Sequence, residues 1–122
     1  MAAAACGESE EAGQRAGPQT SIEVTLWPDG RGTGESRTVV LTCEPAGGSR
    51  ADPEEACAAL YSEEDALEPG PGNVACTQIY GGPQEARIAG VVRGREVDVL
   101  FNRSNGCEID RWDRLGPVLE PS

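Results

Sequence analysis

The sequence contains neither histidine nor lysine: all ten of its basic residues are arginines. The absence of histidine excludes Ser-His-Asp and Cys-His catalysis and the His-rich zinc sites of hydrolases. The absence of lysine excludes Schiff-base chemistry and a phosphate-loop lysine. The 21 acidic residues are so many that no carboxylate pair stands out as an acid–base site. We therefore expect the protein not to be an enzyme, and we expect no cofactor and no metal site.

Positive charge and long apolar runs are also scarce. The net charge of −11 excludes nucleic acid as a partner, because neutralising phosphates requires cations. No segment approaches the roughly 20 consecutive apolar residues that span a bilayer. Contact with a membrane is therefore expected only if Cys6 carries a lipid. Its context, Ala-Ala-Ala-Cys-Gly, distantly resembles a bacterial lipoprotein cleavage site, and an incidental free thiol is the simpler alternative.

The length of 122 residues suits one domain with a modest hydrophobic core, in which aromatic residues make up 4% of the chain. Residues 1–19 contain no large apolar side chain beyond Met1, and we expect them to form a disordered tail. Residues 20–122 are expected to form the domain. The use of arginine alone, with much Ala, Gly, Pro, Glu and Asp, indicates a bacterial source with a G+C-rich genome.

Alternating apolar residues predict several β-strands. Ile22, Val24 and Leu26 alternate with polar residues, which is the pattern of a strand with one buried face. The last two predicted strands are joined by Arg93-Gly94, a length typical of a tight β-hairpin turn. The predicted strands cover residues 22–26, 37–43, 86–92 and 95–101.

A helix is predicted after Asp52. Asp52 is placed to cap it, Pro53 suits its first position, and Glu55 completes a capping box. Residues 56–60 give the helix an apolar side. The stretch 62–73 that follows is acidic and then rich in Gly and Pro, so we expect a long surface loop.

The five cysteines stand at positions 6, 43, 57, 76 and 107. No Cys-x-x-Cys pair occurs, so the spacing does not fit a zinc site or a thioredoxin-type site. With Cys6 set aside in the tail, four cysteines allow three disulfide pairings. Four buried thiols in a cytosolic protein are the alternative, but an oxidising compartment explains this number better.

Five segments form a recognisable series along the chain: TVVLTCEP (38–45), EEACAAL (54–60), VACTQIYGGP (74–83), GVVRGREVDVLF (90–101) and SNGCE (104–108). The order of the cysteines, the place of the helix and the Cys-x-x-x-Tyr spacing are specific when they are taken together. Over about residues 22–110 the series resembles the Streptomyces subtilisin inhibitor family of secreted serine protease inhibitors.

The resemblance implies an α+β fold: a two-layer sandwich of a five-stranded antiparallel sheet with two helices. It implies two disulfides, Cys43–Cys57 and Cys76–Cys107. It also implies a secreted protein that forms a homodimer through its sheet surfaces. Lipid on Cys6 would in addition anchor it at the cell surface.

The resemblance also assigns a reactive site that binds subtilisin-like serine proteases as a substrate does. Gln78 takes the primary specificity position P1, and Ile79 follows the scissile bond as P1′. Asn105 matches a family position that supports the loop. The remaining residues of the protease-binding loop are Val74, Ala75, Cys76 (P3), Thr77 (P2), Tyr80 (P2′) and Gly81.

The sequence departs from the family at two places. Family members often have Pro at P2 and Met or a basic residue at P1, where this chain has Thr77 and Gln78. The apolar C-terminal strand of the family is replaced by residues 111–122, which we expect to make a short helical turn around Trp112 that stops at Gly116-Pro117.

Two other functions fit the same scaffold. In the first, the protein is a substrate or regulator of a transglutaminase, which would use Gln78 or, in the tail, Gln14. In the second, it is a non-inhibitory extracellular lipoprotein module that binds a partner.

Overall fold

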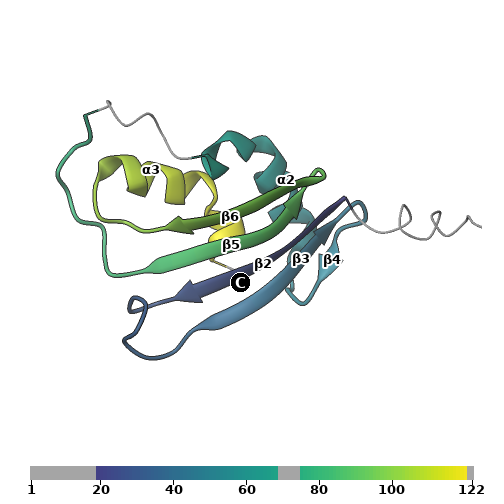
Figure 1. Ribbon diagram of the computed structural model, residues 1–122, viewed down its shortest axis with the longest axis horizontal. Coiled ribbons are helices and arrows are strands. Elements are labelled where there is room, and N and C mark those ends of the chain that lie inside the picture. The colour runs from purple at the N-terminus through teal and green to yellow at the C-terminus, as the bar shows by residue number, and fades with distance from the viewer. Residues whose placement is uncertain (1–18, 69–74, 121–122) are drawn as a thin grey trace, which may run out of the picture.

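The computed structural model describes residues 19–68 and 75–120. Cys6, Gln14 and Val74 lie outside the described residues. The fold is α+β, and its five-stranded antiparallel sheet has the strand order β4-β3-β2-β5-β6, with the helices on one face (Figure 1). The strands are β2 (Thr20–Trp27), β3 (Arg37–Cys43), β4 (Gly47–Gly48), β5 (Glu85–Val92) and β6 (Arg95–Phe101). The helices are α2 (Pro53–Ser62), the 3-10 helix η1 (Glu64–Leu67), α3 (Gly106–Arg114) and α4 (Gly116–Leu119).

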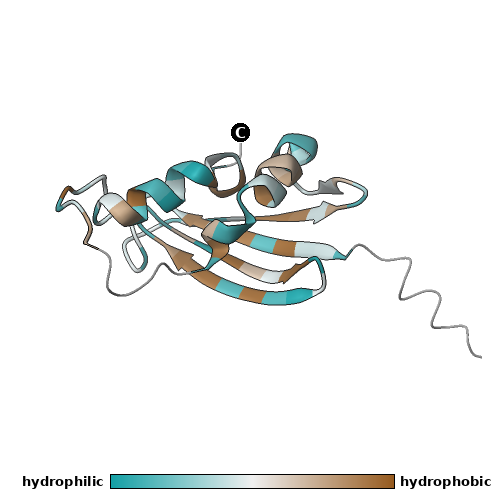
Figure 2. Cartoon of the chain, turned by 90° about the horizontal axis from the view of Figure 1, so that it is seen from above, coloured by the Kyte–Doolittle hydropathy of each residue, from teal (hydrophilic) through white to brown (hydrophobic). Residues whose placement is uncertain are grey.

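The predicted strands are confirmed, with ends that shift by at most two residues. Along β2 every second side chain is buried, including Ile22, Val24 and Leu26. Val24 lies opposite Val39 on β3 and Ile88 on β5, so apolar side chains of neighbouring strands meet on the face that the helices cover. Figure 2 shows this alternation of polar and apolar residues along the strands, with the helices above them.

The turn of the β5–β6 hairpin contains the two predicted residues. Val92 pairs with Arg95, and Arg93 and Gly94 between them have φ angles of 52° and 83°. Positive φ at both central residues is the backbone of a type I′ turn, which matches the twist of paired strands. Leu100, which breaks the alternation in the sequence, is 44% exposed and lies on the face away from the helices.

Helix α2 forms where the sequence predicts it and buries Ala56, Cys57 and Leu60. The predicted capping box is wrong, because the side chain of Asp52 makes no capping hydrogen bond. Its carboxylate instead accepts a hydrogen bond of 2.9 Å from Nε of buried Arg50. The stretch predicted to be a loop after residue 62 begins with η1, because Ala66 and Leu67 reach the core.

The C-terminal residues supply the second half of the helical layer. Trp112 on α3 is 1% exposed, and Val118 and Leu119 on α4 are fully buried. A helical turn around Trp112 was expected, but Gly116-Pro117 begins the short helix α4 instead of ending regular structure. Proline suits this place because the first turn of a helix needs no N–H donor. The fifth strand of the sheet is β4, at the opposite edge from β6.

Two disulfides join the same pairs that the family resemblance implies. Cys43–Cys57 links the end of β3 to α2, with 5.9 Å between the two Cα atoms. Cys76–Cys107 links the segment before β5 to the first turn of α3, with 5.3 Å between the Cα atoms. The first disulfide therefore fastens the two layers together, whereas the second holds a surface segment against a helix.

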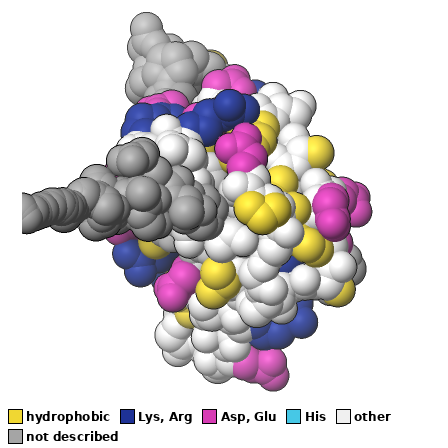
Figure 3. Space-filling view, turned by 90° about the vertical axis from the view of Figure 1, so that its right-hand side faces the viewer, with side chains coloured by type: hydrophobic (Ala, Val, Ile, Leu, Met, Phe, Trp, Pro, Cys, Tyr) yellow, Lys and Arg dark blue, Asp and Glu magenta, His cyan; other side chains and the backbone are white. Residues whose placement is uncertain are grey.

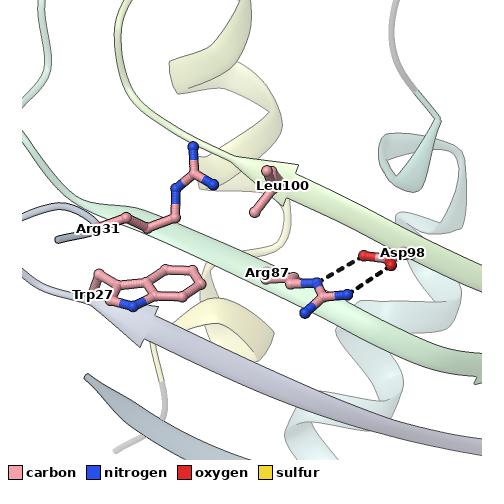
Figure 4. Close-up of a pocket in the computed structure, with 5 residues that line it drawn as sticks. All are labelled: Trp27, Arg31, Arg87, Asp98 and Leu100. Carbon is pink, nitrogen blue, oxygen red and sulfur yellow. Dashed lines mark hydrogen bonds and ion pairs between the residues drawn. The ribbon is translucent and has the colours of Figure 1, made fainter.

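The opposite face of the sheet is left open by the described helices (Figures 1 and 2). At one end it forms a shallow hollow of about 520 Å³ lined by Trp27, Arg31, Arg87, Asp98 and Leu100 (Figure 4). Arg87 donates two hydrogen bonds, of 2.8 and 2.7 Å, to the two oxygens of Asp98. This guanidinium lowers the pKa of the Asp98 carboxyl below its usual value.

Candidate functional site

Residues 75–84 form an irregular segment that leads into β5 and runs beside α3 at one end of the molecule (Figure 1). The segment contains no charged residue, although the protein has a net charge of −11. The surface shown in Figure 3 differs, because acidic and basic side chains are interspersed on it. A neutral segment can enter the binding cleft of another protein without burying an unpaired charge.

Large apolar side chains are exposed at the tip of this segment. Tyr80 is 71% exposed and Ile79 is 53% exposed; with Leu100, they are the large hydrophobic residues that the described part of the chain exposes. Gln78, the residue before them, is also exposed. Three consecutive side chains therefore face solvent, and each is available to a partner.

The backbone before these residues is held by the start of α3. The disulfide fixes Cys76 to Cys107, and the N–H of Gly106 donates a 2.8 Å hydrogen bond to the carbonyl of Thr77. A Cβ atom on Gly106 would lie 3.0 Å from Cβ of Thr77, so a larger residue at 106 would push the two backbones apart. The loop thus depends on a glycine that sequence reasoning did not single out.

The backbone turns at Gln78. The N–H of Ile79 donates a 3.0 Å hydrogen bond to the carbonyl of Thr77, which closes a three-residue turn centred on Gln78. The side-chain amide of Gln78 donates a 3.3 Å hydrogen bond to the carbonyl of Cys76. The backbone therefore bends at the residue assigned to P1, although β-branched residues such as Thr77 and Ile79, which flank it, favour extended backbone.

The backbone after these residues is held by Arg103. The N–H of Gly81 donates a 2.7 Å hydrogen bond to the carbonyl of Arg103, and Nε of Arg103 donates one of 3.1 Å to the carbonyl of Gly81. This contact could not be read from the sequence, because 22 residues separate the two partners and Arg103 belongs to none of the segments that carry the family resemblance.

The side chain of Asn105 caps α3. Its Oδ1 accepts a 3.0 Å hydrogen bond from the N–H of Glu108, which is the arrangement expected of an N-cap residue. Asn105 therefore determines where α3 begins, and the first turn of that helix carries both Gly106 and Cys107.

The chemical groups of this segment are those of a binding surface. Its polar side chains are a hydroxyl, a phenol and amides, with no base beside a nucleophile. Over residues 19–68 and 75–120, no cluster of His, Cys, Asp and Glu could hold a metal ion. In the same ranges, no helix is long and apolar enough to cross a bilayer.

The sequence profile of the subtilisin inhibitor-like family matches residues 18–105, which include the whole sheet and the exposed segment. The chain belongs to this family. Subtilisin inhibitor-like protein 1 of Streptomyces cacaoi is 38% identical over 81 residues, which are 62% of this chain and 72% of that protein. Helices α3 and α4 lie beyond the residues that the family profile matches, since α3 begins at Gly106.

A solved structure also resembles the chain. It is sermetstatin of Streptomyces caespitosus in complex with subtilisin of Bacillus licheniformis, and the match covers 85% of this chain and 99% of that one. The two chains are 24% identical and superpose with a TM-score of 0.53. This likeness supports the fold.

Proposed function

We propose that the protein is an extracellular inhibitor of subtilisin-like serine proteases and has no catalytic activity of its own. It enters the protease active site as a substrate does, with Gln78 at P1 and Ile79 at P1′. The observation that carries this proposal is the exposure of residues 78–80 between two anchored ends, Thr77 on one side and Gly81 on the other. Family membership and the two disulfides, which suit an oxidising compartment, support it.

The anchors explain how such a loop would inhibit a protease. A flexible peptide loses conformational entropy when a protease orders it, at about 1–2 kcal/mol for each residue fixed. Residues 76, 77 and 81 are already ordered by the disulfide and by hydrogen bonds to the segment 103–107. More of the contact free energy therefore becomes affinity.

Titration of the protein against two proteases tests the proposal. We expect stoichiometric inhibition of subtilisin and inhibition of trypsin weaker by about three orders of magnitude. The neutral amide of Gln78 supplies no cation to the buried carboxylate of the trypsin specificity pocket, which would be desolvated and left unpaired. Residual activity is measured at increasing molar ratios of inhibitor to protease. Full subtilisin activity at a tenfold molar excess would show that the protein is not an inhibitor of this class.

The open face of the sheet is the surface on which we propose that two copies pair. Leu100 is exposed there and Trp27 is half-buried, and both line the hollow on strands that no described helix covers from this side. The family resemblance points to the same arrangement. Burial of a tryptophan often contributes much of the energy of an interface, and a leucine beside it adds apolar area, so these two residues are the best probes of the dimer.

We expect the wild-type protein to sediment as a dimer. Replacing Trp27 and Leu100 together by alanine should raise the dissociation constant at least a hundredfold, because it removes most of the large apolar area that we assign to the contact. Sedimentation velocity over a concentration series measures the change. Tyr80→Ala is the matched control, since it removes a large exposed side chain from the loop and should leave the dimer intact. A monomeric wild-type protein would contradict the assignment.

The exposed amide of Gln78 is also what a transglutaminase substrate requires. That reaction needs a glutamine on flexible backbone, and the disulfide and hydrogen bonds around Gln78 restrain it. We therefore place the transglutaminase function second.

A further inference from the structure

We infer that Arg103 is a positioning residue of the inhibitory loop, and that it holds the segment after the scissile bond both before and after cleavage. The inference rests on the proposed function and extends it. Neither the sequence pattern nor the family resemblance assigns a role to this arginine.

Arg103 and Gly81 hold each other through a reciprocal pair of hydrogen bonds. The main chain of Arg103 accepts from the Gly81 N–H at 2.7 Å, and its side chain donates to the Gly81 carbonyl at 3.1 Å. Both backbone polar groups of one loop residue are therefore satisfied by a single partner. The second bond is charge-assisted, and such bonds are roughly twice as strong as neutral ones.

The guanidinium of Arg103 is itself fixed. Its Nη1 lies 3.0 Å from Oδ1 of Asp113 on α3, and its side chain is 19% exposed. Its terminal carbon lies 5.8 Å from the ring centroid of Trp112, a core residue. Contacts with α3 therefore restrain the guanidinium of Arg103, and the guanidinium in turn restrains the carbonyl of Gly81 that accepts its hydrogen bond.

The loop also lies so close to α3 at position 81 that a side chain there would require the side chains of Ile109 and Arg103 to shift. A Cβ atom there would lie 2.8 Å from Cδ1 of Ile109 and 3.1 Å from Nε of Arg103. Glycine therefore lets the backbone approach the helix and the arginine together. The close approach and the hydrogen bonds both hold Gly81, the third residue after the proposed scissile bond, against α3.

We call the reciprocal hydrogen bonds between Arg103 and Gly81 the clamp. The clamp acts when a protease attacks the bond between Gln78 and Ile79. The serine oxygen of the protease bonds to the Gln78 carbonyl carbon, and the Ile79 nitrogen leaves as an amine with the proton that the serine loses. In the reverse step the amine nitrogen attacks the ester carbon, the serine oxygen leaves and regains its proton, and the peptide bond is restored. Water can attack the same ester instead, which frees the serine hydroxyl and leaves the cleaved protein with a carboxyl group on Gln78. Resynthesis reverses this step: the serine oxygen bonds to that carboxyl carbon again, water leaves, and the amine then attacks the ester. Return requires only that the amine stays close, and Gly81, two residues away, is held by Arg103.

Arg103→Ala tests the clamp. We expect the equilibrium ratio of cleaved to intact protein, reached with a catalytic amount of subtilisin, to rise about tenfold, because without these hydrogen bonds the cleaved form gains the freedom of roughly one more backbone residue than the intact form does. Resynthesis from purified cleaved protein should slow to match. In the free protein, hydrogen exchange at the amides of residues 79–82 should become faster. Mass spectrometry measures all three quantities.

Arg114→Ala is the matched control, because it breaks ion pairs of α3 with Glu63 and Asp65 on the other side and does not touch the loop. Asp113→Asn is a second variant in case Arg103→Ala does not fold, and it should shift the ratio in the same direction by a smaller factor. If the wild-type protein inhibits subtilisin, and Arg103→Ala and Asp113→Asn both give the same ratio of cleaved to intact protein as Arg114→Ala, the inference about Arg103 is wrong and the proposed function stands.

A wild-type protein that does not inhibit subtilisin would overturn the proposed function instead. The exchange measurement then decides the question about Arg103 without reference to a protease. Faster exchange at residues 79–82 in Arg103→Ala than in Arg114→Ala supports the clamp, and equal exchange overturns it.

Discussion

Replacing Cys76 and Cys107 together by serine will turn the protein from an inhibitor of subtilisin into a substrate. The disulfide holds the P3 residue against α3 and closes a loop with a sequence separation of 31. A cross-link of this span stabilises the folded protein by on the order of 4 kcal/mol, because it removes conformational entropy from the unfolded chain. When the link is lost, the loop regains part of that conformational freedom. We expect inhibition to weaken at least a hundredfold, and we expect net cleavage after Gln78, detected by mass spectrometry.

The other disulfide supplies the control for this experiment. Replacing Cys43 and Cys57 by serine removes a link of sequence separation 14 between β3 and α2 and should cost about 3 kcal/mol of folding stability. It leaves the contacts of Cys76 and Thr77 with α3 in place. At temperatures below the midpoint of its thermal unfolding, this variant should still inhibit subtilisin. If the Cys76/Cys107 variant remains intact and equally potent, the disulfide does not hold the loop and the mechanism is wrong.

Changing Gln78 to lysine will move the specificity of the protein toward trypsin. The side chain of Gln78 is exposed and donates a 3.3 Å hydrogen bond to the carbonyl of Cys76, and its substitution leaves the disulfide and both backbone anchors in place. The new ammonium group pairs with the carboxylate of the trypsin specificity pocket and removes the cost of burying that charge alone. We expect trypsin inhibition to strengthen about a thousandfold, measured as an inhibition constant.

Gln78→Met is the neutral control for this change, because it has a similar length and carries no charge. It should keep subtilisin inhibition and gain nothing against trypsin. If Gln78→Lys gains no trypsin inhibition while still inhibiting subtilisin, then residue 78 does not occupy the primary specificity pocket, and the reactive bond lies elsewhere in the segment.

The sheet could be predicted from the sequence because its signals are local. Alternation at Ile22, Val24 and Leu26 reports a buried face, and a two-residue Arg93-Gly94 linker reports a hairpin turn. The prediction that Asp52 caps α2 was wrong because of a contact with a distant part of the chain. The carboxylate of Asp52 accepts from Arg50, whose side chain is buried by donating to the carbonyls of Pro117 and Val118 on α4.

The candidate site could be predicted in part. The exposure of Gln78, Ile79 and Tyr80 in the structure fits the assignment that the family resemblance implies, which stays a prediction. The supports at Arg103 and Gly106 could not be predicted, because a hydrogen bond from a side chain or backbone to a distant carbonyl leaves no periodic or spacing signal in the sequence. They appear only once α3 is placed beside the loop.

The separation of the loop tip from the core has a consequence for how this protein changes over evolutionary time. Residues 78–80 are exposed, while the groups that hold the loop come from the segment 103–107 and the disulfide. Substitutions on the surface away from such supports usually change folding stability by less than about 0.5 kcal/mol. The three tip positions are therefore free to diverge with the proteases that a host encounters, and a new target does not require a new scaffold.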